Sequence, residues 1–146
     1  MLLTGTYPRT LDDKKRLALP SRVRDQLGTP GLLYITPGPD RSLWIFTLEA
    51  LERLAEKLDQ APETDADGRA YQRLFFSRSE AVPVDRAGRI LIPDRSIHYA
   101  ELKPEVVLIG VRDHLELWDG GRWEGYFHDN APRFDAVAER AFPRNR

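Results

Sequence analysis

The sequence predicts a mixed α/β protein, rich in β-strands and built from two similar halves. A charged turn followed by a short apolar strand occurs at residues 12–20 and again at 85–93, and the Asp, Arg and Pro of the two copies all lie 73 positions apart. The same order of short helix, two apolar strands and longer helix follows each copy. A half of about 70 residues is too small to bury a good core alone. We therefore expect the halves to pack together, exchange hairpins and close one small β-barrel flanked by helices.

The second copy of the repeated stretch shows its chemistry most clearly. Asp85 can cap its own backbone, and Gly88 can adopt a positive φ at little cost. Residues 90–92 are Ile-Leu-Ile, which is typical of a strand, and Pro93 cannot continue a central strand. The first copy has Asp12 and Arg16 in the same places and predicts the same turn and strand.

In the first half we expect strands at residues 4–7, 17–19, 32–36 and 42–46, and Pro8 should end or bend the first of them. A short helix should run from Ser21, as N-cap, to Gly28, with Val23 and Leu27 facing inward. A longer helix should follow the N-cap Thr47. Its apolar residues recur at helical spacing and are expected to face inward: Leu48, Leu51, Leu54, Ala55 and Leu58.

A connecting helix joins the halves in this interpretation. After a linker at 61–63, residues 64–67 resemble a capping box and open a helix that carries Tyr71, Leu74, Phe75 and Phe76. In the second half we expect strands at 80–84, 90–92, 105–111 and 114–118, a helical segment at 94–102 and a helix starting at Asp119. The pattern fades from about Pro132, and 143–146 should be a frayed tail. The expected units are a first repeat at 1–60, a connecting helix at 61–78, a second repeat at 79–128 and a tail at 129–146.

Composition excludes several kinds of protein. There is no cysteine among the 146 residues, which rules out disulfides, thiolate metal sites and cysteine catalysis. No apolar run approaches the ~20 residues of a membrane span, and residues 1–5 lack the features of a signal peptide, so the expected compartment is the cytoplasm. The net charge of −1 argues against strong non-specific binding to nucleic acid. Between Arg9 and Arg24, however, six basic residues stand against two acidic ones.

The basic residues of the turns allow two interpretations. In the first, Arg16 or Arg89 enters a DNA groove and contacts guanine with two hydrogen bonds, while neighbouring basic residues contact phosphates. In the second, Asp12–Arg16 and Asp85–Arg89 are ion pairs that only close the turns. Exposed pairs contribute about 0–1 kcal/mol, which is a weak reason to build the same pair twice.

Other candidate sites are less convincing. His98, His114 and His128 share no metal-ligand spacing, and no serine or glycine lies in a nucleophile-elbow or phosphate-loop pattern. The large aromatic residues could stack on nucleobases, but their strand and helix spacing favours the core or a subunit interface. These residues are Trp44, Trp118, Trp123, Phe75 and Phe76. Nothing in the sequence indicates a catalytic or metal site.

The sequence resembles the MraZ family of bacterial transcription regulators, which are built from tandem AbrB-type swapped-hairpin modules. The resemblance rests on two features, the paired Asp-x-x-x-Arg turns and the Phe75-Phe76-Ser77 helix between them, with further matching stretches as far as Phe127. Two departures stand out. Lys15 replaces the usual glycine of the first turn, so its backbone should be less left-handed or slightly strained. Ala87 replaces a polar or basic residue, so the second copy should contribute less to binding.

The resemblance implies a cytoplasmic, nucleoid-associated, DNA-binding repressor rather than an enzyme, without cofactor or small-molecule substrate. It also implies ring-shaped homo-oligomers that bind direct repeats in the promoter of their own operon, a division and cell-wall gene cluster. The expected DNA-binding residues are Lys14, Lys15, Arg16, Arg86 and Arg89, and Asp12, Asp85 and Gly88 should orient the turns. The alternatives are an oligomeric scaffold, an antitoxin-like AbrB-type regulator of another target and, least supported, an enzyme.

Overall fold

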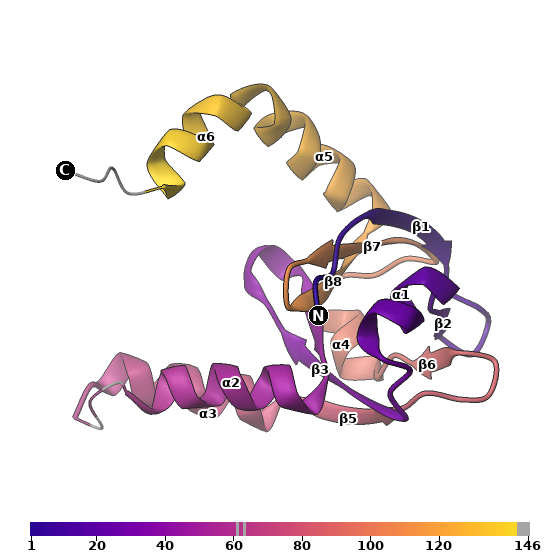
Figure 1. Ribbon diagram of the computed structural model, residues 1–146, viewed down its shortest axis with the longest axis horizontal. Coiled ribbons are helices and arrows are strands. Elements are labelled where there is room, and N and C mark those ends of the chain that lie inside the picture. Colours follow the sequence, from indigo (N-terminus) through magenta and orange to yellow (C-terminus); the bar gives the residue numbers. More distant parts are fainter. Residues whose placement is uncertain (61, 63, 143–146) are drawn as a thin grey trace.

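The computed structural model describes residues 1–60, 62 and 64–142 and contains the same series of strands and α-helices twice, with the 3-10 turns at different places (Figure 1). The first series is β1 (Thr6–Thr10), β2 (Arg16–Ala18), α1 (Ser21–Leu27), β3 (Leu32–Pro37), the 3-10 turn η1 (Pro39–Arg41), β4 (Leu43–Phe46), α2 (Leu48–Asp59) and α3 (Ala66–Ser77). The second is β5 (Glu80–Pro83), β6 (Arg89–Leu91), α4 (Asp94–Tyr99), β7 (Glu105–Val111), β8 (His114–Asp119), α5 (Gly120–Asn130), the 3-10 turn η2 (Ala131–Arg133) and α6 (Phe134–Ala141). The predicted mixed α/β class is confirmed.

The strands form an antiparallel six-stranded sheet in the order β1-β7-β8-β4-β3-β5 and a two-stranded ribbon, β2-β6. The strands β1, β3 and β4 of the first half have β5, β7 and β8 as their counterparts in the second. Exchanging each strand for its counterpart gives the same order read from the other edge of the sheet. Each half gives its first strand to the other half, because β1 pairs with β7 and β5 pairs with β3. The halves are thus interleaved about a pseudo-two-fold axis. The strand pairings define two sheets, and the expected closed barrel stays a prediction.

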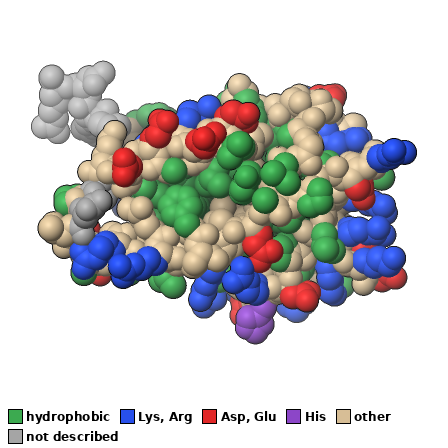
Figure 2. Space-filling model, turned by 90° about the horizontal axis from the view of Figure 1, so that it is seen from below, with side chains coloured by type: hydrophobic (Ala, Val, Ile, Leu, Met, Phe, Trp, Pro, Cys, Tyr) green, Lys and Arg blue, Asp and Glu red, His purple; other side chains and the backbone are tan. Residues whose placement is uncertain are grey.

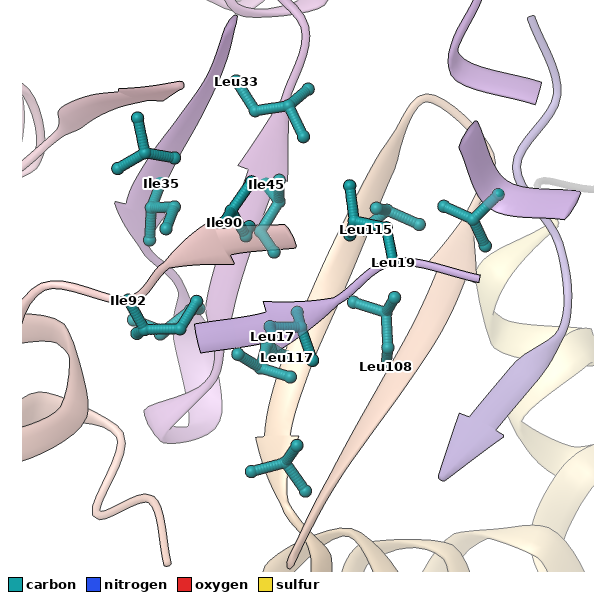
Figure 3. Packing of buried hydrophobic residues seen from close by; sticks show 14 of the residues in the cluster. Leu17, Leu19, Leu33, Ile35, Ile45, Ile90, Ile92, Leu108, Leu115 and Leu117 are labelled. Carbon is teal, nitrogen blue, oxygen red and sulfur yellow. The ribbon is translucent and has the colours of Figure 1, made fainter. Parts of the chain in front are cut away.

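The core lies between the six-stranded sheet and the β2–β6 ribbon (Figure 3). Leu17 of β2 and Ile90 of β6 lie directly opposite each other in the ribbon, and both are almost completely buried. They pack against apolar residues of the large sheet, among them Ile45 of β4 and Leu117 of β8. Because these residues come from both halves, burial of the core holds the halves together.

Several element boundaries differ from the predictions. Pro8 does not end β1, which continues to Thr10. The strand is at the edge of the sheet, where a proline nitrogen that cannot donate a hydrogen bond is tolerated. The first short helix begins after Pro20, so Ser21 is its first residue and makes no side-chain cap. Asp65 rather than Thr64 caps α3. Leu48 at the start of α2 is exposed, whereas Thr47 caps that helix as predicted.

The largest difference is at the C-terminal end, where α6 occupies residues in which no element was predicted. In Figure 1, α2 and α3 lie side by side as a helical pair, whereas α5, which packs against β7 and β8 through Trp123, continues with α6 as an open arch. The linker at 61 and 63 and the tail at 143–146 lie outside the described residues. None of the described helices combines the length and the apolar character needed to cross a membrane.

Candidate nucleic-acid interface

The first turn is organised by the carboxylate of Asp12. Its Oδ1 accepts hydrogen bonds from the backbone N–H groups of Lys14 at 2.9 Å and Arg16 at 2.8 Å. Its Oδ2 accepts from Nε of Arg16 at 2.7 Å, so the same carboxylate fixes both the backbone and the guanidinium. The N–H of Lys15 donates to the Asp12 carbonyl at 3.0 Å and completes the turn.

The second turn has the same geometry with different side chains. Oδ1 of Asp85 accepts from the N–H groups of Ala87 and Arg89, both at 2.9 Å. Oδ2 accepts from Nε of Arg89 at 3.0 Å, and the N–H of Gly88 donates to the Asp85 carbonyl at 2.9 Å. The structure therefore brings both predicted Asp–Arg pairs together.

The fourth residue of each turn has a positive φ, 64° at Lys15 and 77° at Gly88. Each of these residues accepts a hydrogen bond from the other half, from Ile92 N–H to the Lys15 carbonyl and from Leu19 N–H to the Gly88 carbonyl, both at 2.9 Å. Of the two alternatives predicted for Lys15, a less left-handed backbone is wrong and a strained one agrees with the structure. Lys15 adopts the left-handed conformation of the glycine, which costs a residue with a Cβ about 1–2 kcal/mol.

The two arginines share one face of the β2–β6 ribbon. Arg16 lies opposite Leu91 and Arg89 lies opposite Ala18, while the pair between them, Leu17 and Ile90, points into the core. Alternation along a strand places the flanking residues on the outer face, and the side chain of Leu91 is exposed there. Each pair with aspartate uses only Nε. Within residues 1–60, 62 and 64–142, the terminal nitrogens of both guanidinium groups have no hydrogen-bond partner.

The hydrogen bonds to Asp12 and Asp85 also favour their charged forms. The Arg16 N–H contributes most to lowering the pKa of Asp12 below its ordinary value; partial loss of solvent opposes this, and the Arg16 guanidinium lowers the pKa further. The pKa of Asp85 is lowered in the same way, first by the Arg89 N–H. Both carboxylates therefore remain ionised at neutral pH and can hold the arginines in place.

The remaining predicted residues surround the ribbon. Lys14, Lys15 and Arg86 are exposed on the turns. Figure 2 shows Lys and Arg side chains gathered at the right-hand end of the molecule, the end at which the loops before β2 and β6 lie in Figure 1. This end is locally basic although the whole chain carries a net charge of −1.

One residue near the second turn was not singled out from the sequence. Arg24 of α1 lies directly over Gly88, where a Cβ would approach the Arg24 Cδ to 2.7 Å. Nε of Arg24 is buried and has no hydrogen-bond partner among the described residues. The only sequence signal was its membership of the basic excess between Arg9 and Arg24. Spacing alone does not show that a helix of the first half meets the turn of the second.

The other candidate residues have structural positions. His114 lies between the carboxylates of Asp113 at 2.9 Å and Glu116 at 3.3 Å, and its ring contacts Trp44 at 4.4 Å between centroids. No group of three His, Asp or Glu residues in the described part of the chain could hold a metal ion. Phe75 and Trp118 are buried, as expected of core residues.

Comparisons with known proteins agree with the repeated architecture. The family model described as "MraZ protein, putative antitoxin-like" matches the chain twice, at residues 2–74 and 75–145. The chain is 39% identical to the transcriptional regulator MraZ of Moorella thermoacetica, over 95% of this chain and 96% of that protein. It is 40% identical to the transcriptional regulator MraZ of Kineococcus radiotolerans, over 97% of this chain and 98% of that protein.

Proposed function

The chain belongs to the MraZ family, and from this premise we propose that it is a transcriptional regulator that binds double-stranded DNA in a sequence-specific way. The proposed target is a set of short direct repeats in the promoter of its own operon, a division and cell-wall gene cluster, which it represses. The proposed location is the cytoplasm, on the nucleoid. The role is not enzymatic and uses no cofactor.

The observation that carries this proposal is the outer face of the β2–β6 ribbon. A two-stranded ribbon fits the major groove of B-DNA, and an arginine with two free nitrogens can form two hydrogen bonds to guanine. Arg16 and Arg89 lie on that face, each held through Nε by an aspartate. Lys14, Lys15 and Arg86 are assigned to phosphate contacts, which add affinity without sequence preference.

Assembly completes the proposal. One copy offers DNA only a few basic side chains, and the chain as a whole has a net charge of −1. Its affinity for DNA should therefore be low. A closed ring of copies would present one ribbon to each of several successive repeats, and the second and later contacts then benefit from a high effective concentration. We also propose that the ribbon and the six-stranded sheet together form one small barrel shared by two AbrB-like swapped-hairpin repeats, which the reversed strand order supports.

The test is a gel shift with the region upstream of the chain's own operon and a scrambled fragment of the same length and composition. We expect retarded complexes with the natural fragment at protein concentrations that leave the scrambled fragment free. Binding to the scrambled fragment with equal affinity would contradict sequence-specific regulation.

A scaffold is the second candidate function, and one observation favours it. The Arg16 and Arg89 side chains are already bonded to aspartates at 2.7 and 3.0 Å, as expected if the pairs only close the turns. A scaffold would assemble normally and retard neither fragment. An antitoxin-like AbrB-type regulator would retard DNA from another operon instead.

A further inference from the structure

The two halves differ in what lies beside their long helices. In the first half, α3 turns back along α2 (Figure 1). Phe75 of α3 is buried in a cluster with Phe46, Ala50 and Leu51, and Tyr34 of β3 packs against the same cluster. The space beside α2 and β3 is therefore filled by α3, a helix of the same chain.

The equivalent place in the second half is open. Val107 of β7 occupies the place that Tyr34 of β3 has in the first half. Each lies opposite the edge strand given by the other half: Val107 pairs with Pro8 of β1, and Tyr34 pairs with Ala81 of β5. Trp123 is the fourth residue of α5, as Leu51 is the fourth residue of α2. Val107 and Trp123 both line an open groove of about 980 Å³. The groove is also lined by Thr6, Pro8 and Phe127.

The helix α6 follows α5 as α3 follows α2, but it does not turn back into this groove. The backbone is right-handed helical at Asn130, Ala131 and Phe134, and Arg133 between them has φ −101° and ψ 16°. None of these four residues is extended, and α6 continues from α5 as an arch instead of folding back along it (Figure 1). Between α2 and α3, by contrast, the backbone at Asp65 is extended. Along α6, Phe134 and Val137 lie on one face at helical spacing, and they are 71% and 40% exposed.

We infer that the groove beside α5 binds α6 of a second copy of this chain. In this arrangement Phe134 and Val137 take the role that Phe75 has in the first half. The helix that fits is present in every copy, whereas the backbone at η2 directs a chain's own α6 away from its groove. Because the groove and α6 are different surfaces, such contacts are head-to-tail and can close a ring. The inference rests on the proposed homo-oligomer and names the surfaces that form it.

Cysteine cross-linking tests which copy supplies α6, because the natural chain has no cysteine. A Thr6→Cys variant in the groove is mixed with a Val137→Cys variant on α6 and oxidised. The matched control mixes Val137→Cys with Ser21→Cys, an exposed position on α1. We expect covalent dimers at least about tenfold faster in the first mixture, because docking raises the local thiol concentration. Equal rates would overturn the inference. So would a disulfide within single chains that carry both Thr6→Cys and Val137→Cys.

Molar mass provides an independent test. A full chain with Phe134→Ser and Val137→Ser should lose its assembled form in light scattering after gel filtration, while its circular dichroism stays unchanged because both side chains are exposed. The control is Leu74→Ser, which removes an exposed apolar residue of α3 outside the groove. An assembly unaffected by the α6 substitutions would overturn the inference and leave the proposed ring intact. A monomeric natural chain would overturn both, and the gel shift would then decide DNA binding separately.

Discussion

The two turns are held by the same hydrogen bonds to an aspartate, but their positively charged side chains lie at different positions. The first contains Asp-Asp-Lys-Lys-Arg at residues 12–16 and the second contains Asp-Arg-Ala-Gly-Arg at 85–89, so each has a net charge of +1. Only the first Asp and the last Arg are shared. This difference separates two roles. The shared Asp–Arg pair fixes a guanidinium on the outer face of the ribbon, whereas the variable positions contribute charge that need not be aligned with a base.

The largest effect should come from the shared arginines, and it should be equal in the two turns. Arg16→Ala or Arg89→Ala should each cost ~1–3 kcal/mol of specific binding per lost guanine contact, and in an assembly every copy loses it at once. Binding to the natural fragment and the scrambled fragment is measured across a salt series. Arg22→Ala, at an exposed position of α1, is the matched control. A double variant that melts normally and still prefers the natural fragment would remove the arginines from the interface. A double variant that unfolds would favour turn-closing ion pairs.

The next effect concerns the left-handed residues. Gly88→Ala should lower the free energy of unfolding by about 1–2 kcal/mol, because φ is +77° and the new Cβ would meet the Arg24 side chain. Lys15→Gly should raise it by up to about 1 kcal/mol, because the strain at φ 64° is relieved. Urea unfolding followed by tryptophan fluorescence measures both. If Lys15→Gly lowered the free energy of unfolding as Gly88→Ala does, the two turns would not share the same requirement for a left-handed residue.

The variable charges should change binding without changing specificity. Lys14→Ala and Arg86→Ala should each weaken binding to natural and scrambled DNA alike, and reduce the slope of log affinity against log salt by about one unit. Ala87→Lys, which gives the second turn the charge that Lys14 gives the first, should increase the slope by a similar amount. If one of these changes altered the ratio of specific to non-specific affinity, that side chain would contact a base.

The smallest effect should be the pH dependence of the turns. The pKa values of Asp12 and Asp85 are lowered in the folded chain. The stability they contribute is therefore present above their unfolded pKa values and is lost as pH falls through the lowered folded values. Asp12→Asn should flatten the acid part of a curve of melting temperature against pH, because it removes a stabilisation that is present near neutral pH and absent at low pH, so the variant and the natural chain should converge as pH falls. Asp85→Asn should act alike, and a difference between the two would show that their turns are not electrostatically equivalent.

The repeat made much of this fold predictable from sequence. Strand positions followed from short apolar runs between turn residues, and Asp–Arg spacing predicted both turns because their hydrogen bonds are local. Other features depend on distant partners. Pro8 lies within a strand because β1 is at an edge. Leu48 fits an apolar helical stripe, yet it is exposed because no residue in the described part of the chain covers it at the start of α2.

The site was only partly predictable for the same reason. The outer face of the ribbon exists because β2 pairs with β6 from the other half, so the positions of Arg16 and Arg89 relative to each other depend on topology. The contact of Arg24 with the second turn depends on it as well. The helix α6 was missed because its apolar stripe is short and follows Pro132, although proline is well tolerated in the first turn of a helix.

The interleaving of the halves constrains how the chain can fold during synthesis. Thr6 of β1 pairs with Ile109 of β7, and Leu33 of β3 pairs with Val82 of β5. The first half therefore emerges from the ribosome with one edge of β3 open until β5 (Glu80–Pro83) is available, and with β1 unpaired until β7 (Glu105–Val111) has been translated. Long-range pairings of this kind make folding slow, and open strand edges favour aggregation in the interval. A ribosome stalled after the first half should accordingly display a chain that proteases cleave and chaperones bind, and protection should arise in one step after β7 and β8 have left the exit tunnel.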